Sequence, residues 1–204
     1  MPRKPLGVSK WIIIFFLSSS FGTITKVSTF ISPTASGKRP LPPIQKRQML
    51  FKKKKLAKHC SVYISDKQEE IIIASRHVNK AGIIYEQENC KTLLKSVSFS
   101  ELGTQIIDSM NLFSLKDKNL RESKLTDWPA FKHSKSKSVR AFEKEYVNIS
   151  VVSCNEYNLI IDIEGFPYKD SELKVISTIS FYADKEEIGK RIIKVYEACL
   201  TGKL

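Results

Sequence analysis

Acidic residues are missing from the first 55 positions of this 204-residue chain. That leader contains 12 of the 34 basic residues, which leaves 22 basic residues and all 21 acidic residues for positions 56–204. The net charge of +13 therefore belongs almost wholly to the leader, and the rest of the chain is nearly neutral. A strongly basic surface of the kind that binds nucleic acid is not expected beyond the leader.

The chain also has few residues suited to catalysis or metal binding. It contains three histidines, none at a spacing typical of a metal site or an oriented base, and no glycine-rich phosphate loop follows an expected strand. His59 beside Cys60 comes nearest to a nucleophile pair, but adjacent residues of a strand point to opposite faces. We therefore expect a protein that is not an enzyme and that needs no cofactor or metal.

Cysteine occurs four times without a C-x-x-C pair or a regular framework. This scatter argues against a disulfide network and favours small buried hydrophobic residues in a reducing compartment. A cytoplasmic location is the expectation that follows. The cysteines concerned are Cys60, Cys90, Cys154 and Cys199.

Long apolar runs are absent from the leader as well. Its basic start and apolar stretch 11–17 look in part like a secretory signal or a transit peptide, but serines at 18–20 and Lys26 interrupt the roughly 20 apolar residues that a membrane span needs. We expect residues 1–55 to be a basic extension, disordered or apolar, with the natural start at Met49 as the favoured explanation. Export or a membrane anchor stays the minority alternative.

The chain does contain one helix start written twice. Ser98 and Asp184 are N-cap residues, and Glu101 and Glu187, three positions later, are expected to complete a capping box in each helix. Apolar positions then repeat at a constant spacing of 86 residues on one helical face. The repeated pairs are Leu102 and Ile188, Ile106 and Ile192, Ile107 and Ile193, Met110 and Tyr196, and Phe113 and Cys199.

A glycine also repeats in the first turn of both helices, as Gly103 and Gly189. Glycine lowers helix stability relative to alanine, so its presence predicts the close approach of another backbone. The matching cap, acid, glycine and apolar positions indicate an internal duplication.

Short β-rich segments precede each of the two helices. Residues 59–64 and 70–75 predict a hairpin followed by strands at 83–85 and 93–97, and residues 147–152 and 158–163 predict a second hairpin followed by a turn at 165–168 and a strand at 173–181. Between the halves we expect weak helical character at 115–123, a connector at 124–137 and a helix at 138–146. The fold class is therefore α+β, an antiparallel or mixed β-sheet with helices packed on it, in a single domain at 56–204 built from two similar β-hairpin–strand–helix halves.

This order of segments resembles the contact-dependent growth inhibition immunity proteins of bacteria (CdiI-type) over residues 58–200. The residues that carry the resemblance lie in both strand pairs, both glycine-bearing helices and the connector. They are Ser61 to Ile64, Ser98 with Glu101-Leu102-Gly103, Trp128, Ser138-Val139 with Ala141-Phe142, Ile149 to Val152, Leu159 to Ile163, and Asp184 with Glu187-Ile188-Gly189. The short turn at 164–167 departs from the family pattern, and the leader has no counterpart in it.

The resemblance implies an inhibitor that binds and neutralises a cognate contact-dependent toxin domain, usually a nuclease, by blocking its active site in the cytoplasm. Its partner would be the C-terminal domain of a toxin protein, with no small-molecule substrate, no direct contact to nucleic acid and no stable membrane insertion. The identity of the toxin does not transfer between relatives, and the oligomeric state stays open.

A nuclease inhibitor is expected to present acids and a few aromatic anchors to a basic cleft. Candidate interface residues occur in the connector and around the turn that follows the second hairpin. They are Trp128, Phe131, Asp162, Glu164, Phe166, Tyr168, Asp170 and Glu172. Trp128 could instead cover the core, and the acids could be ordinary solvated loop charges.

A basic-tail protein that binds nucleic acid or an anionic surface is the alternative. It would use the leader, the lysines at 52–55 and the lysine-rich stretch 132–137. Its affinity should fall steeply with added salt and vanish when residues 1–55 are removed. An immunity protein that begins at Met49 should still bind its toxin.

Overall fold

The computed structural model describes residues 56–121, 123–155, 157–167 and 173–202. The whole leader and three of the expected interface residues lie outside these ranges, so the predictions about them stay predictions. In the described chain, groups of consecutive strands are followed by helices. They are β1 (His59–Ser65), β2 (Glu70–Val78), β3 (Ile84–Glu86), β4 (Lys91–Leu94), α1 (Phe99–Asn111), β5 (Ser114–Leu115), the short 3-10 turn η1 (Leu125–Asp127), α2 (Pro129–Lys132), α3 (Val139–Glu145), β6 (Val147–Ser153), β7 (Ile160–Gly165), β8 (Val175–Ser180) and α4 (Lys185–Thr201).

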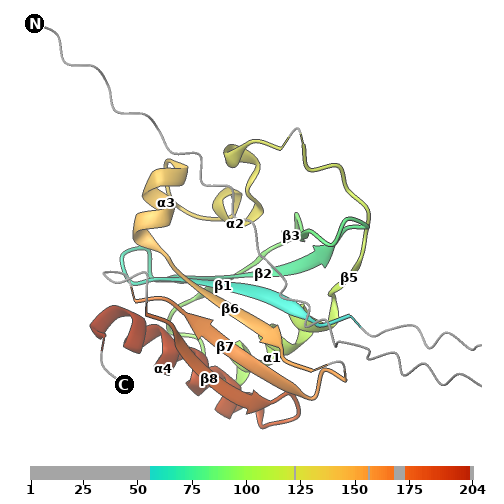
Figure 1. Ribbon diagram of the computed structural model, residues 1–204. Coiled ribbons are helices and arrows are strands. Elements are labelled where there is room, and N and C mark those ends of the chain that lie inside the picture. Colours follow the sequence, from blue (N-terminus) through green and yellow to red (C-terminus); the bar gives the residue numbers. More distant parts are fainter. Residues whose placement is uncertain (1–55, 122, 156, 168–172, 203–204) are drawn as a thin grey trace, which may run out of the picture. The chain divides into compact units, whose positions relative to one another are not determined.

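The strands form one sheet in the order β3-β2-β1-β6-β7-β8, and β4 and β5 also pair with β2 (Figure 1). All of these pairs are antiparallel except β2 with β5. The hairpins β1–β2 and β6–β7 lie on either side of the central pair β1–β6, in which Val62 faces Ile149. The predicted α+β class is therefore confirmed, and the two similar halves meet at the middle of the sheet.

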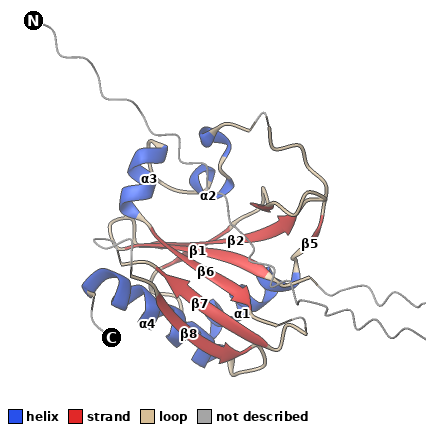
Figure 2. Cartoon of the chain, in the orientation of Figure 1, coloured by secondary structure: helices blue, strands red, loops and turns tan. Residues whose placement is uncertain are grey.

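Alternation along the strands sends one set of side chains to a single apolar face, here called the inner face. Val62, Ile73, Ile149 and Ile163 on this face are at most 1% exposed, and α1 and α4 pack over them. Figure 2 shows these two helices behind the strands β6, β7 and β8. Burial of this aliphatic layer is the main hydrophobic contribution to the fold.

The duplicated glycines lie where the first turns of α1 and α4 touch. A Cβ atom added to Gly103 would overlap the backbone carbonyl oxygen of Lys185, and one added to Gly189 would overlap that of Phe99. Phe99 and Lys185 are separated by the same 86 residues as the glycines, so the two contacts are reciprocal. The predicted close approach of another backbone is confirmed. The glycine of each helix makes room for the backbone of the other helix.

The helix caps differ slightly from the prediction. Ser98 Oγ accepts from the backbone N–H of Glu101 at 3.2 Å, as expected. Asp184 accepts from the N–H of Glu186 at 3.0 Å, whereas the carboxylate of Glu187 accepts from Arg191 Nε at 2.8 Å. The expected capping box of α4 is therefore wrong, because an arginine one turn later binds the carboxylate of Glu187. In α1 the structure shows the bond from the N–H of Glu101 to Ser98, and not the returning bond from the Ser98 N–H to the Glu101 carboxylate that would complete the box.

On the opposite, outer face of the sheet, the connector forms a small cover over β1 and β2. Phe142 of α3 is 1% exposed and packs against Tyr63, Trp128, Phe131 and Tyr146, with ring centroids 4.6 to 6.1 Å apart. Ile72 and Ala74 of β2 complete this second cluster. We refer to α2 and α3, with the residues that join them, as the cap.

Several local predictions are wrong. Residues 116–123 form no helix among those described, because β5 first pairs with the end of β2 and the chain then runs without regular structure. Phe113, expected on the apolar face of the first helix, lies beyond its end and stacks on His59. Gly165 belongs to β7 and packs on Cys199 instead of opening the turn. Cys154 is exposed and not buried, since the chain turns outward after β6.

The strand expected at 93–97 is found two residues earlier, at Lys91–Leu94, because its pairing with β2 ends at Leu94. No helix among the described residues has the length and apolar composition to cross a membrane.

Candidate partner-binding surface

The outer face of β6, β7 and β8 has no cap. In Figure 1 these strands lie in front of α1 and α4, and the cap lies above them over the other half of the sheet. Ile160 of β7 and Ile176 of β8 are 41% and 51% exposed, and Thr178 and Ser180 beside them are also exposed. We refer to the outward side chains of β6, β7 and β8 as the open face.

Two of the predicted interface acids lie on the open face. Asp162 stands opposite Thr178, whose hydroxyl donates to its carboxylate at 2.6 Å, and Glu164 pairs with Lys174 at 2.8 Å. Phe166 follows at the end of β7 and is 52% exposed. The open face is thus mixed, with exposed isoleucines among acids that already have partners in the chain.

Three further predicted interface residues, Tyr168, Asp170 and Glu172, lie outside the described residues. Trp128 and Phe131 are described, and both are partly buried against the second cluster. The indole Nε1 of Trp128 donates to Glu86 at 2.9 Å. Both aromatic residues therefore hold the cap in place, and a role for them in partner binding stays a prediction.

Two carboxylates of the sheet fasten the cap. Glu86 of β3 accepts from Tyr63 Oη, from Trp128 Nε1 and from the backbone N–H of Ala130. Glu70, which is 2% exposed, accepts from Tyr146 Oη and pairs with Lys135 Nζ at 3.0 Å. A buried carboxylate is tolerated because it is fully hydrogen bonded.

Sequence reasoning missed both carboxylates, which look like ordinary surface charges in a strand and at a turn. Their donors are distant in the chain, so no local spacing marks them. The contact of Glu70 also bears on the lysine-rich stretch 132–137, which the alternative function would use to bind an anionic surface. Two of its lysines pair with acids, Lys132 with Asp127 at 3.7 Å and Lys135 with Glu70.

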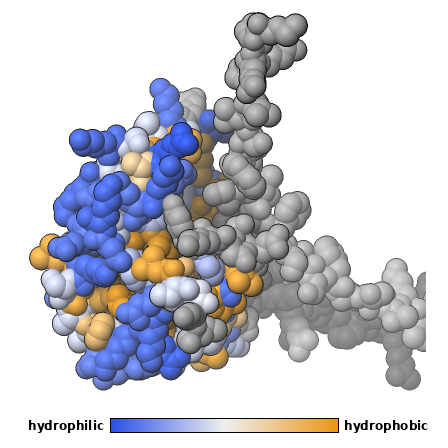
Figure 3. Space-filling view, turned by 90° about the vertical axis from the view of Figure 1, so that its left-hand side faces the viewer, coloured by the Kyte–Doolittle hydropathy of each residue, from blue (hydrophilic) through white to orange (hydrophobic). Residues whose placement is uncertain are grey.

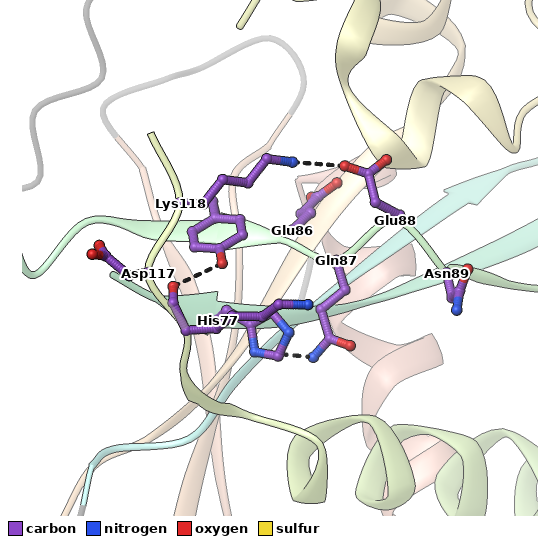
Figure 4. A pocket seen from close by; sticks show the side chains of 9 residues that line it. His77, Glu86, Gln87, Glu88, Asn89, Asp117 and Lys118 are labelled. Atoms are coloured by element: carbon purple, nitrogen blue, oxygen red, sulfur yellow. Dashed lines mark hydrogen bonds and ion pairs between the residues drawn. The ribbon is translucent and has the colours of Figure 1, made fainter. Parts of the chain in front are cut away.

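A shallow cavity of about 200 Å³ lies beside β3 at the far edge of the sheet. His77, Gln87, Glu88 and Lys118 line it, and Figure 4 shows their side chains turned toward one another. Lys118 pairs with Glu88 at 2.7 Å, and the Nδ1 of His77 lies 3.0 Å from the hydroxyl of Ser114. Lys118 and Glu88 therefore neutralise each other in the cavity.

The residues considered for catalysis are separated by the sheet. Cys60 is fully buried in the inner core, where burial raises the pKa of its thiol to about 12, so the thiolate needed for attack does not form near pH 7. His59 belongs to the outer face. Among the described residues no group of three or more histidine, cysteine, aspartate or glutamate side chains could hold a metal ion.

Figure 3 shows another side of the molecule, where hydrophilic residues dominate and apolar residues gather in smaller patches between them. Small apolar patches of this kind are normal for a protein surface. The open face differs because its exposed isoleucines belong to one continuous sheet.

The fold is similar to two solved structures. A protein of unknown function from Neisseria meningitidis matches with a TM-score of 0.57 and 14% identity, over 72% of this chain and 98% of that chain. A chain of the CdiA-CT/CdiI toxin and immunity complex from Yersinia pseudotuberculosis matches with a TM-score of 0.54 and 14% identity, over 71% of this chain and 98% of that chain. Neither a protein-family model nor a curated protein sequence matches the chain. At this identity the likeness concerns the fold.

Proposed function

We propose that this protein is an immunity protein that binds and neutralises a cognate contact-dependent toxin domain. The observation that carries the proposal is the shared fold, which extends over nearly the whole of a chain from a toxin and immunity complex. The two glycine-bearing helix starts that led to the same expectation from the sequence lie in equivalent contacts. In this proposal the toxin is a nuclease, and the protein acts in the cytoplasm by covering its active site.

The proposed binding surface is the open face together with Phe166. An inhibitor surface needs a few apolar anchors within a polar rim, because the anchors supply most of the affinity and the rim supplies specificity. Ile160, Ile176 and Phe166 could act as such anchors, and Asp162 and Glu164 as part of the rim. The occupant is the toxin domain itself, which would cover the half of the outer face that the cap leaves bare.

Coexpression tests this function. The full chain is produced in bacteria together with the C-terminal domain of the toxin protein encoded directly upstream of its gene, and surviving colonies are counted. We expect survival with the cognate domain and continued killing with an unrelated toxin domain. Continued killing with every upstream domain, despite soluble full-length protein, contradicts the proposal.

A further inference from the structure

Exposed apolar side chains gather at the end of the sheet where the described chain begins and where β6 turns into β7. Tyr157 and Leu159 lie in that turn, and Tyr182 follows the end of β8. Tyr157 is 60% exposed and Tyr182 is 74% exposed. The backbone N–H of Phe181 donates to the carbonyl of Leu159, so the two segments touch. We refer to these three residues and the exposed Leu56 as the end patch.

The buried side chain of Asn158 fixes the start of the described chain beside this patch. Its Oδ1 accepts from the backbone N–H of Lys58 at 3.0 Å, and its Nδ2 donates to the carbonyl of Leu56 at 3.1 Å. Asn158 has a positive φ of 58°, a left-handed conformation that asparagine tolerates better than most residues. The carbonyl of Lys58 also accepts from the N–H of Ser153 at 2.9 Å. The chain therefore enters the domain along the β6–β7 turn.

The residues directly before Leu56 have the composition and the reach to cover the end patch. Leu50 and Phe51 are the nearest apolar residues of the leader, and the four lysines at 52–55 separate them from Leu56. An extended chain spans about 3.5 Å per residue, so five residues reach about 17 Å from the contact with Asn158. The members of the end patch lie one or two residues from the backbone contacts described above, and are therefore within this reach.

Charge favours the same location for the lysines at 52–55. Asp162 stands opposite Val152, two residues before the β6–β7 turn, and Asp184 follows Tyr182 by two residues. Asp162 accepts from the hydroxyl of Thr178, and Asp184 accepts from a backbone N–H. Neither donor carries a charge, so both carboxylates keep their negative charge near the end patch. A surface ion pair adds little stability, so the apolar contacts supply most of the energy.

We propose that Leu50 and Phe51 fold back onto the end patch, so that the folded domain begins at Met49. The occupant is a segment of this chain because the contacts of Asn158 keep it beside the patch at a high effective concentration, which a separate molecule lacks. The last residues of the leader then belong to the domain, and a start at Met49 retains all of them. This inference does not depend on the proposed function.

Urea unfolding of the full chain tests the contact through a double-mutant cycle of Phe51→Ser and Tyr182→Ser. Each substitution alone should lower the unfolding midpoint by about 0.5 M, and the double variant should fall no further, because the two rings lose one shared contact. Phe16→Ser, in the apolar stretch of the leader, is the control and should leave the midpoint unchanged. A midpoint of Phe51→Ser equal to that of the control, or two losses that add, overturns the proposal.

Limited digestion of the full chain with trypsin locates the segment. Cleavage after the lysines at 52–55 should be at least about fivefold slower in the wild type than in Tyr182→Ser, whereas cleavage after Lys26 should be equal in both. Equal cleavage at 52–55 in the two proteins overturns the proposal. A second copy of the chain on the end patch would instead make the wild-type midpoint rise with protein concentration and leave Phe51→Ser unchanged, which also overturns it.

Discussion

The two halves of the molecule share an inner face and differ on the outer face. In the first half the cap covers β1 and β2, and the second cluster with Phe142 lies beneath it. In the second half the equivalent surface of β7 and β8 stays open, with Ile160 and Ile176 exposed. The symmetric part of the duplication therefore builds the core, whereas the asymmetric part leaves the outer surface of β7 and β8 uncovered.

The strongest test of the symmetric part is a methyl group at either glycine of the helix contact. Gly103→Ala and Gly189→Ala should each lower the free energy of unfolding by about 4 kcal/mol or prevent folding, because the new Cβ meets backbone and not a movable side chain. Chemical denaturation measures both. Similar losses in the two variants would support the equivalence of the halves, and a small loss in either would contradict it.

Gly82→Ala is the matched control for this test. Gly82 has a positive φ of 81°, but an added Cβ would meet no atom within 4 Å. The expected cost is about 1 kcal/mol, from backbone strain alone.

Removal of the central ring of the cap tests the difference between the outer faces. Phe142→Ala should cost about 3 to 4 kcal/mol, because the ring is fully buried among four other aromatic residues. Ile176→Ala on the open face should cost about 0.5 kcal/mol or less, since this side chain is already half exposed. Equal losses from the two substitutions would mean that the open face is covered in the native protein.

Loss of charge at Glu86 tests how firmly the cap is held. Glu86→Gln should cost about 2 kcal/mol, because the neutral amide accepts more weakly from its three donors and brings a donor of its own. Glu88→Gln is the control, since Glu88 is exposed and pairs with Lys118 on the surface, and its expected cost is about 0.5 kcal/mol or less. Urea unfolding of the two variants measures both losses. Equal losses would mean that the hydrogen bonds of Glu86 contribute little to holding the cap on the sheet.

Stability should also depend on the protonation of His59 at the border of the open face. Its pKa is lowered to about 4 in the folded protein, so the unfolded chain binds the proton more readily below pH 6.5. The contribution of neutral His59 is complete above pH 6.5 and is lost as the pH falls toward 4, by about 3 kcal/mol.

Urea unfolding of the wild type and of His59→Gln between pH 7 and pH 4 measures this loss of stability. An equal loss in both proteins would contradict its assignment to His59. Burial also lowers the pKa of His77, which contributes a slope in the same direction to both proteins. The difference between the wild type and the variant is therefore the quantity to compare.

The sequence predicts the symmetric core well because the signals for it are local. A cap residue, a glycine and apolar residues at helical spacing all lie within one segment, as at Ser98 and Gly103. The two-residue strand β5 escaped prediction because only its pairing with β2 defines it. The prediction of a capping box at Glu187 is wrong because Arg191, one turn later, binds the carboxylate of Glu187.

The candidate surface was only partly predictable, since it depends on the order of strands. The sequence shows Asp162, Glu164 and Phe166 only as residues near one turn, and their position beside exposed isoleucines follows from the sheet. The bare state of the open face follows from where the cap lies. No spacing in the sequence encodes it.

The affinity of the protein for the toxin domain proposed as its partner, measured with Ile176→Arg and with Arg140→Glu, tests the central claim most directly. Ile176 lies on the open face and Arg140 on the exposed side of α3, so each substitution changes the charge of one outer surface. We expect Ile176→Arg to weaken binding at least about 100-fold and Arg140→Glu to change it less than about threefold. Unchanged binding in Ile176→Arg together with a large loss in Arg140→Glu would place the partner on the cap and contradict the account.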